Sequence, residues 1–265
     1  CQVIGDLMAD VKNNLSPIHE INDKKWIAIL PGSKKAKLSI GIPFFLEVAD
    51  RIKECEDNIN LMIPIAPTTE LEDFIFFQSA KNPITKYYSS NIKSIKKIEN
   101  SIFNYVLETC KNTKIFILQQ NSNHNILSQC KLALTTVGAN TAELAAINLP
   151  MIVVLPTQHL NAMNAWDGIF GIIGRIKLLN RIQTFIIKKW YLKNNKFFAW
   201  PNIKANKQII PERVGIISPK DISDEAIYLL KEKDLLVEQK LNLLKMRGKR
   251  GAVKKLSNLI LETIA

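Results

Sequence analysis

The apolar residues of this chain fall into short runs that alternate between two periods. Five runs are almost wholly apolar, as expected of strands buried on both faces of a sheet, and they lie at residues 26–30, 60–66, 114–118, 132–135 and 151–155. Between them, apolar positions recur at helical spacing at residues 42–52, 70–78 and 140–147. Apolar strands that alternate with helices predict an α/β fold with a Rossmann-like, doubly wound parallel sheet.

Some stretches depart from this alternation. Pro43 is expected near the first turn of its helix, where proline is tolerated. Residues 81–97 are polar and basic and predict a surface excursion. Residues 168–200 mix aromatic and aliphatic side chains with Lys and Arg, which fits a segment on an anionic membrane surface and equally a core helix pair with solvated lysines. From residue 223 onward the pattern is helical and charged.

Composition and charge narrow the class of protein. The 265 residues contain 36 Lys and Arg against 24 Asp and Glu, which gives a formal net charge of +12. Such a charge suits nucleic acid or an anionic membrane. A general bias toward Lys, Asn and Ile explains the charge as well, and because no nucleic-acid-binding motif accompanies it we expect no nucleic-acid partner.

The cysteines and histidines are too scattered for a metal or disulfide framework. The four cysteines form no C-x-x-C pair and the three histidines form no H-E-x-x-H motif, so we expect no metal site. No apolar run reaches the roughly 18 residues of a spanning helix. These features favour a protein of the reducing cytoplasm.

The turn after the run at 26–30 is the first candidate ligand site. In open parallel sheets, ligands bind beyond the carboxyl ends of the strands. Gly32 lets the backbone approach a ligand, Ser33 offers a hydroxyl and Lys34 offers a cation. An ordinary Pro-Gly turn with exposed lysines explains the same spacing equally well.

The turn after the run at 132–135 is the second candidate. Thr136, Gly138, Asn140 and Thr141 are small or polar residues at a helix start, where free N–H groups favour a phosphate. Glu143, one turn further, would accept hydrogen bonds from a ribose diol. The alternative is a capping box with Asn140 as N-cap and Glu143 at N3, and the pattern alone favours this cap.

Several nucleotide and metal signatures are missing from the sequence. There is no G-x-x-x-x-G-K-[ST] motif, and the glycines at 168, 171 and 174 follow no strand, which excludes a P-loop and a dinucleotide fingerprint. No D-x-D pair offers itself to a divalent metal. A sugar-nucleotide enzyme of this kind would stabilise its leaving diphosphate with a helix dipole and a cation, without a metal or cofactor.

In their order, these turns resemble those of lipid-A-disaccharide synthases, which are inverting glycosyltransferases of the GT-B type. The pieces that carry the resemblance are residues 3–7, 30–34, 43–46, 137–143, 150–153, 200–202 and 210–212. Lys34 stands where that family has Arg. Residues 158–162 are instead similar to the Gln-x-x-Asn-Ala motif of the peptidoglycan lipid-intermediate N-acetylglucosaminyltransferase.

The resemblance implies a UDP-sugar donor and assigns roles to the residues of both turns. It implies that the diphosphate is held by Gly32, Ser33, Lys34, Thr136, Gly138, Asn140 and Thr141. It favours Glu143 as the ribose ligand over the cap, because the spacing from Gly138 matches that superfamily. It places three further side chains at the donor sugar, namely Gln158, Asn161 and Asn202.

The implied reaction belongs to lipid A biosynthesis. A glucosamine-like sugar, acylated or not, would pass to a lipid-linked or acylated-sugar acceptor, with the protein in peripheral contact with an anionic membrane on its cytoplasmic face. The chain opens at Cys1, at residues similar to the family's interdomain connection. We therefore expect a fragment that binds UDP but transfers no sugar, with its catalytic base in a missing N-terminal domain.

Three parts follow from this interpretation. Residues 1–22 are expected to be an interdomain linker, residues 23–222 the nucleotide-sugar-binding domain, and residues 223–265 closing helices broken at Gly248 and Gly251. A UDP-sugar epimerase of the same architecture and a non-enzymatic basic module for a membrane surface remain as alternatives.

Overall fold

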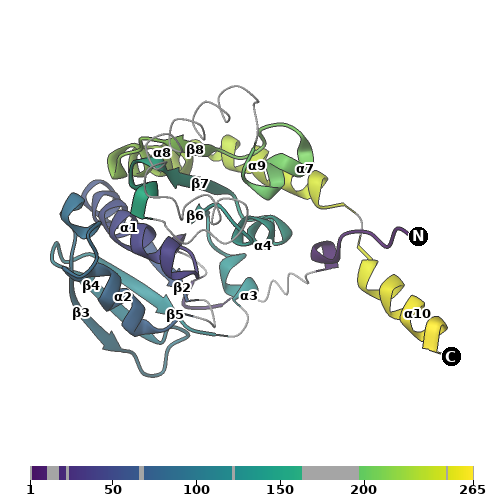
Figure 1. Ribbon diagram of the computed structural model, residues 1–265, viewed down its shortest axis with the longest axis horizontal. Coiled ribbons are helices and arrows are strands. Elements are labelled where there is room, and N and C mark those ends of the chain that lie inside the picture. The colour runs from purple at the N-terminus through teal and green to yellow at the C-terminus, as the bar shows by residue number, and fades with distance from the viewer. Residues whose placement is uncertain are drawn as a thin grey trace.

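A single mixed β-sheet organises the computed structural model, which describes residues 2–10, 18–21, 24–65, 69–120, 123–162, 197–248 and 250–264. In these ranges the sheet has eight strands in the order β3-β4-β5-β2-β1-β6-β7-β8 (Figure 1). The strands are β1 Lys25–Leu30, β2 Ile59–Pro64, β3 Ile92–Lys97, β4 Tyr105–Thr109, β5 Lys114–Leu118, β6 Leu132–Thr136, β7 Met151–Pro156 and β8 Glu212–Gly215.

Helices connect and cover these strands. The α-helices are α1 Lys35–Cys55, α2 Leu71–Gln78, α3 His124–Leu127, α4 Asn140–Ala146, α7 Trp200–Ala205, α8 Pro219–Lys231, α9 Lys233–Arg247 and α10 Ala252–Ile264. The short 3₁₀ helices are η1 Leu7–Asp10, η2 Thr85–Tyr87 and η3 Thr157–Ala162. The segment 168–196, expected at a membrane or in a core helix pair, lies outside the described residues.

The predicted Rossmann-like α/β fold is confirmed, and the predicted parallel sheet is extended at both edges. The five predicted strands are β1, β2, β5, β6 and β7, all paired in parallel. The apolar pattern did not predict β3 and β4, which add antiparallel strands next to β5, or β8, which pairs in parallel with β7. These three strands lie at or near sheet edges and are partly exposed, so they lack an unbroken apolar run.

Both faces of the sheet are covered, which explains the unbroken apolar runs. Ile27 and Ile29 of β1 pack on one face with residues of α1, α2 and α8. Trp26, Ala28 and Leu30 pack on the other with residues of α3, α4 and α9. Because successive side chains of a strand point to opposite faces, a strand covered on both sides needs apolar residues at every position.

Helix α1 contains a proline in its interior, which corrects the expectation that Pro43 lies in the first turn. The helix begins at Lys35, well before the apolar stripe from which it was predicted. Proline has no N–H, so the carbonyl of Ser39 loses its helical partner. The buried amide of Asn82 replaces that partner, donating from Nδ2 to Ser39 O at 2.7 Å and to Phe77 O at 2.6 Å.

The stretch expected as a surface excursion is tied to α1 over much of its length. Besides Asn82, the Ser90 hydroxyl donates to the buried carboxylate of Asp50 at 2.5 Å, and the Ser89 N–H donates to Glu47 at 2.7 Å. The stretch ends in the exposed edge strand β3. The stretch is thus a surface excursion, as expected, with most of its residues exposed or half-buried, but the buried side chains of Asn82 and Ser90 anchor it to α1.

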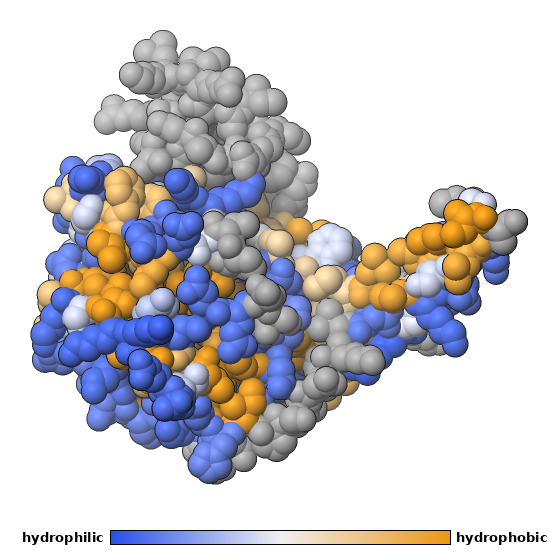
Figure 2. Space-filling model, turned by 90° about the horizontal axis from the view of Figure 1, so that it is seen from below, coloured by the Kyte–Doolittle hydropathy of each residue, from blue (hydrophilic) through white to orange (hydrophobic). Residues whose placement is uncertain are grey.

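The two ends of the described chain lie together, away from the sheet (Figure 1). The carboxylate of Asp10 accepts hydrogen bonds from the N–H groups of Val253 and Gly251 at 2.7 and 2.6 Å, which lower the pKa of this carboxyl. Helix α10 carries an exposed apolar face that includes Leu261 and Ile264 (Figure 2). No helix among the described residues is long and apolar enough to cross a membrane.

The closing helices expected from residue 223 correspond to α8, α9 and α10, with breaks at Gly248 and Gly251 as predicted. Helix α8 already begins at Pro219, and its residues Ile222, Ala226 and Leu229 join the core around α1. The expected boundary after residue 222 therefore falls inside a helix that packs on the sheet domain.

The proline in α1 generates a prediction that a double-mutant cycle can test. Asn82→Ala should lower the free energy of unfolding by about 1–3 kcal/mol, because it leaves buried carbonyls of α1 and α2 without a donor. In a Pro43→Ala background the restored N–H can take up the Ser39 carbonyl, so the same substitution should cost about 1 kcal/mol less. Urea denaturation of the four proteins measures this coupling. An equal loss in both backgrounds would contradict it.

Candidate ligand site at the carboxyl edge of the sheet

Both predicted ligand turns lie at the same edge of the sheet. Strands β1 and β6 are neighbours and pair in parallel, with Leu30 opposite Thr135. The turn at residues 31–34 follows β1, and the turn at residues 137–139 follows β6. Parallel strands present their carboxyl ends at one edge, so the pairing brings together turns that lie far apart in the sequence.

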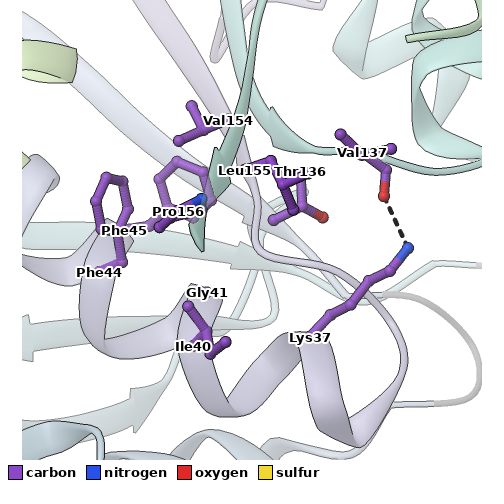
Figure 3. A pocket seen from close by; sticks show the side chains of 10 residues that line it. All are labelled: Lys37, Ile40, Gly41, Phe44, Phe45, Thr136, Val137, Val154, Leu155 and Pro156. Atoms are coloured by element: carbon purple, nitrogen blue, oxygen red, sulfur yellow. Dashed lines mark hydrogen bonds between the residues drawn. The ribbon is translucent and has the colours of Figure 1, made fainter. Parts of the chain in front are cut away.

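A lysine that the sequence analysis did not single out joins the two turns. Lys37, in the first turn of α1, donates from Nζ to the carbonyl oxygen of Val137 at 2.7 Å (Figure 3). Burial, together with the positive charge of Lys34, lowers the pKa of Lys37 below its ordinary value. The feature of the sequence that could have identified Lys37 is its position three residues after Lys34, on the same helix face. The residue that it contacts, Val137, lies 100 residues away in the sequence.

The two glycines of the turns pack directly against this lysine. Gly32 has φ +116° and Gly138 has φ +152°, conformations that favour glycine. A Cβ at Gly32 would lie 2.7 Å from Lys37 Cβ, and a Cβ at Gly138 would lie 2.7 Å from Lys37 Nζ. Both glycines therefore provide the space through which the side chain of Lys37 passes from one turn to the other.

An apolar pocket lies beside this bridge, between α1 and the ends of β6 and β7. It is lined by Lys37, Ile40, Gly41, Phe44, Phe45, Thr136, Val137, Val154, Leu155 and Pro156 (Figure 3). A Cβ at Gly41 would collide with the carbonyl oxygen of Pro31, so glycine at this position lets α1 approach the first turn. In the described part of the chain, the buried hydroxyl of Thr136 has no hydrogen-bond partner.

The remaining residues of the first turn line its exposed side. Ser33 is exposed, and its carbonyl lies 3.4 Å from the hydroxyl of the buried Thr69, which precedes α2. Lys34 is exposed and occupies the N-cap position of α1. Together with Lys37, these residues bring a hydroxyl and two cations to one end of the sheet.

Glu143 lies on the exposed side of α4, and the capping-box alternative is wrong. The N-cap of α4 is Ala139, whose backbone is already helical at φ −56° and ψ −33°, and no side chain caps the helix. Asn140 is therefore the first helical residue. Among the described residues, the exposed carboxylate of Glu143 has no hydrogen bond or ion pair, so it is available to a ligand.

Thr141 was expected at the diphosphate, and the structure buries it instead. It is 0% exposed, and its hydroxyl donates to Gly138 O at 2.9 Å and accepts from Trp200 N–H at 3.1 Å. The hydroxyl connects the second turn to the start of α7. Its hydrogen-bonding capacity is used within the protein, which corrects the sequence-based assignment.

Asn202 was expected to face the donor sugar, and the structure corrects this as well. It is 0% exposed, and its Nδ2 donates to Ile210 O and to Glu212 Oε1 at 3.0 and 2.7 Å. Its Oδ1 accepts from the N–H groups of Ile209 and Ile210 at 2.7 and 3.0 Å. With both ends of the amide engaged, Asn202 fixes the segment that leads into β8.

Gln158 lies after β7, where its amide pairs with the backbone of Ile217. Its Nε2 donates to Ile217 O at 2.7 Å and its Oε1 accepts from Ile217 N–H at 3.3 Å, which ties η3 to the loop after β8. The side chain of Asn161 lies outside the described residues. Next to Gln158, the ring of His159 lies 4.7 Å from that of Tyr87, and burial lowers the pKa of His159.

The polar groups at this edge of the sheet are cations, a hydroxyl and a carboxylate. Among the described residues, no group of three or more His, Cys, Asp or Glu side chains could hold a metal ion. The two turns and the helix starts that follow them carry two ammonium groups, the Thr136 hydroxyl and the Glu143 carboxylate. Cations beside backbone turns bind phosphates, and a carboxylate accepts hydrogen bonds from a diol.

The reassignment of Asn202 generates a prediction about stability. Asn202→Ala should lower the free energy of unfolding by about 2–4 kcal/mol, because it leaves three buried backbone groups without partners and removes one hydrogen bond from the buried carboxylate of Glu212. Asn258→Ala, at an exposed position of α10, serves as control and should stay within about 0.5 kcal/mol of the parent. Denaturant titration of both variants measures this difference in stability. Equal stability of the two variants would contradict this structural role of Asn202.

Curated relatives support the resemblance that the sequence motifs indicate. The chain is 24% identical over 242 residues to the lipid-A-disaccharide synthase of Sulfurihydrogenibium sp. strain YO3AOP1, covering 90% of this chain and 51% of that protein. It is 22% identical over 238 residues to the synthase of Nitrosococcus oceani, covering 89% and 47%. The chain thus spans about half the length of these relatives. No protein-family model matches the chain.

Solved structures show more distant likenesses. A complex of S. aureus MnaA with UDP aligns at a TM-score of 0.47 and 11% identity, covering 91% of this chain and 47% of that one. TarM aligns at a TM-score of 0.47 and 12% identity, covering 95% and 37%. Alignments this loose do not bear on function. The sequence comparisons confirm the predicted resemblance: over most of its length the chain is similar to lipid-A-disaccharide synthases.

Proposed function

We propose that this chain binds the UDP-sugar donor of a GT-B glycosyltransferase of the lipid-A-disaccharide synthase type. The observation that carries the proposal is the Lys37 bridge between two turns at the carboxyl edge of the sheet. The name shared by the curated relatives supports the reaction class. Because the chain spans about half of their length, the activity, donor and acceptor of the whole protein are part of the proposal.

In this proposal the two turns hold the diphosphate of the donor. The exposed residues Ser33 and Lys34 lie on one side, and Gly138 and Asn140 lie on the other. Lys37 lies between them and adds a positive charge. The carboxylate of Glu143, which is exposed, accepts hydrogen bonds from the two hydroxyls of the ribose.

The proposed chemistry is one inverting displacement at the anomeric carbon. A hydroxyl oxygen of the acceptor forms the new bond to this carbon, and the bond to the β-phosphate oxygen breaks with its electron pair leaving on UDP. The hydroxyl proton passes to a general base, which we place outside the described residues. The cations at the two turns stabilise the negative charge that develops on the leaving diphosphate.

The donor sugar, the acceptor and the location that we propose rest on the name of the curated relatives. We propose a glucosamine-like donor sugar, acylated or not, and a lipid-linked or acylated-sugar acceptor. An acceptor of this kind lies in a bilayer, so the protein would work in peripheral contact with the cytoplasmic face of a membrane. The chain's net charge of +12 suits an anionic lipid surface.

Glu143 offers the sharpest test of the nucleotide site. Glu143→Gln should weaken UDP binding by about tenfold or more, because the ribose loses charge-assisted hydrogen bonds. The melting temperature should stay unchanged, since the side chain is exposed and caps no helix. Isothermal titration with UDP measures the affinity, and Glu262→Gln on the exposed side of α10 is the matched control.

Two results would overturn the proposal. One is a parent chain that does not bind UDP at all. The other is a Glu143→Gln variant with a lowered melting temperature and unchanged UDP affinity. Release of free sugar from a UDP-sugar without any acceptor would instead indicate an epimerase-type activity.

A further inference from the structure

We propose that Lys37 is the cation that recognises the diphosphate, and that its ammonium group moves from the Val137 carbonyl to the phosphate oxygens when the donor binds. This inference rests on the proposed function and assigns a new positioning residue to the same site. It also names the change that the ligand would make in the protein. In the structure the ammonium is held in the turn by a neutral carbonyl.

The ammonium group of Lys37 is under-satisfied where it lies. An ammonium has three N–H donors, and the carbonyl of Val137 takes one of them at 2.7 Å. Among the described residues, Lys37 forms no ion pair with a carboxylate, although other lysines of the chain do. A half-buried cation with one neutral partner gains more from an anion than an exposed cation does, because its charge is less screened by water.

The geometry around Nζ leaves a place for a phosphate. The ammonium lies against Gly138, where a Cβ would come within 2.7 Å of Nζ, so the absence of a side chain keeps this side of the cation open. The hydroxyl of Thr136, buried and without a partner among the described residues, lies 3.5 Å from the position of a Cβ on Gly32, the other glycine that packs against Lys37. A phosphate oxygen that enters beside Gly138 would take up N–H donors that the Val137 carbonyl leaves unused.

Charge repulsion between two lysines also favours the binding of an anion beside Lys37. Lys34 and Lys37 lie on one face at the start of α1, and the positive charge of Lys34 contributes to the lowered pKa of Lys37. A dianionic or trianionic ligand offsets this repulsion and favours the charged form of Lys37. The two lysines therefore have different roles: Lys34 contributes charge from the exposed N-cap, and Lys37 contributes a directed hydrogen bond from within the turns.

The test compares ligands that differ only in their phosphate groups. Lys37→Gln removes the charge and keeps an N–H donor on a side chain that is one bond shorter. Affinities of the full chain for uridine, UMP and UDP are measured by titration calorimetry, with ligand-observed NMR for weak binding. We expect Lys37→Gln to weaken UDP binding about tenfold or more and to leave uridine binding unchanged. UMP should show an intermediate loss.

Two further variants complete the experiment. Lys35→Gln, at the exposed first residue of α1, is the matched control and should leave all three affinities unchanged. Lys37→Arg keeps the positive charge and should retain most of the preference for UDP over uridine. Lys37→Arg also keeps a long side chain, so it is the variant to measure if Lys37→Gln does not fold. If a folded Lys37→Arg protein loses the preference for UDP over uridine, this result counts against the inference.

The possible negative results distinguish an error in this inference from an error in the proposed function. A parent chain that binds none of the three ligands refutes the proposed function. A parent chain that binds UDP, with a Lys37→Gln variant that binds it equally well, refutes only the role of Lys37. Equal losses for uridine and UDP show that Lys37 acts through the shape of the turns alone, and this result also overturns the inference.

Discussion

The parallel pairing of β1 with β6 is the constraint on which the candidate site depends. With Leu30 opposite Thr135, the two strands end at the same level, and the turns that follow them come within reach of one lysine side chain. Both strands are buried on both faces, so a shift of register would disrupt the packing of their side chains in both cores. The hydrophobic core thereby fixes the separation of polar groups that lie outside it.

Helix α1 adapts to this geometry at some structural cost. Glycine at position 41 lets the helix lie directly on the carbonyl of Pro31, which brings Lys37 to the edge of the sheet. Two positions further, Pro43 breaks the hydrogen-bond ladder of the same helix, and the amide of Asn82 supplies the missing donor. A polar segment from beyond α2 thus completes a helix whose first turn carries the charge of the site.

Polar residues near the second turn divide into two groups with different physical roles. Thr141 and Asn202 are fully buried and hydrogen-bonded within the protein, so they fix the position of α7 and the approach to β8. Glu143 and Lys37 keep unsatisfied hydrogen-bonding capacity at the edge of the sheet, and the Thr136 hydroxyl has no partner among the described residues. Groups of the second kind are the ones that a ligand can stabilise, because binding adds interactions that folding did not provide.

The sequence by itself determined the central strands and the location of both turns. Strands covered on both faces must be apolar at every position, so β1, β2, β5, β6 and β7 are visible as runs, and their turns as interruptions. The partly exposed strands β3, β4 and β8 carry no such run, and only hydrogen bonds to neighbouring strands define them.

Which polar residues remain unsatisfied at the candidate site was decided by the tertiary structure. The partner of Lys37 lies 100 residues away, and the groups that saturate Asn202 belong to a segment that folds back on α7. Asn140 is not the N-cap of α4, because the chain enters the helix one residue earlier, at Ala139. Spacing along the chain shows which side chains can reach a point, but burial and long-range hydrogen bonds determine which of them remain unsatisfied there.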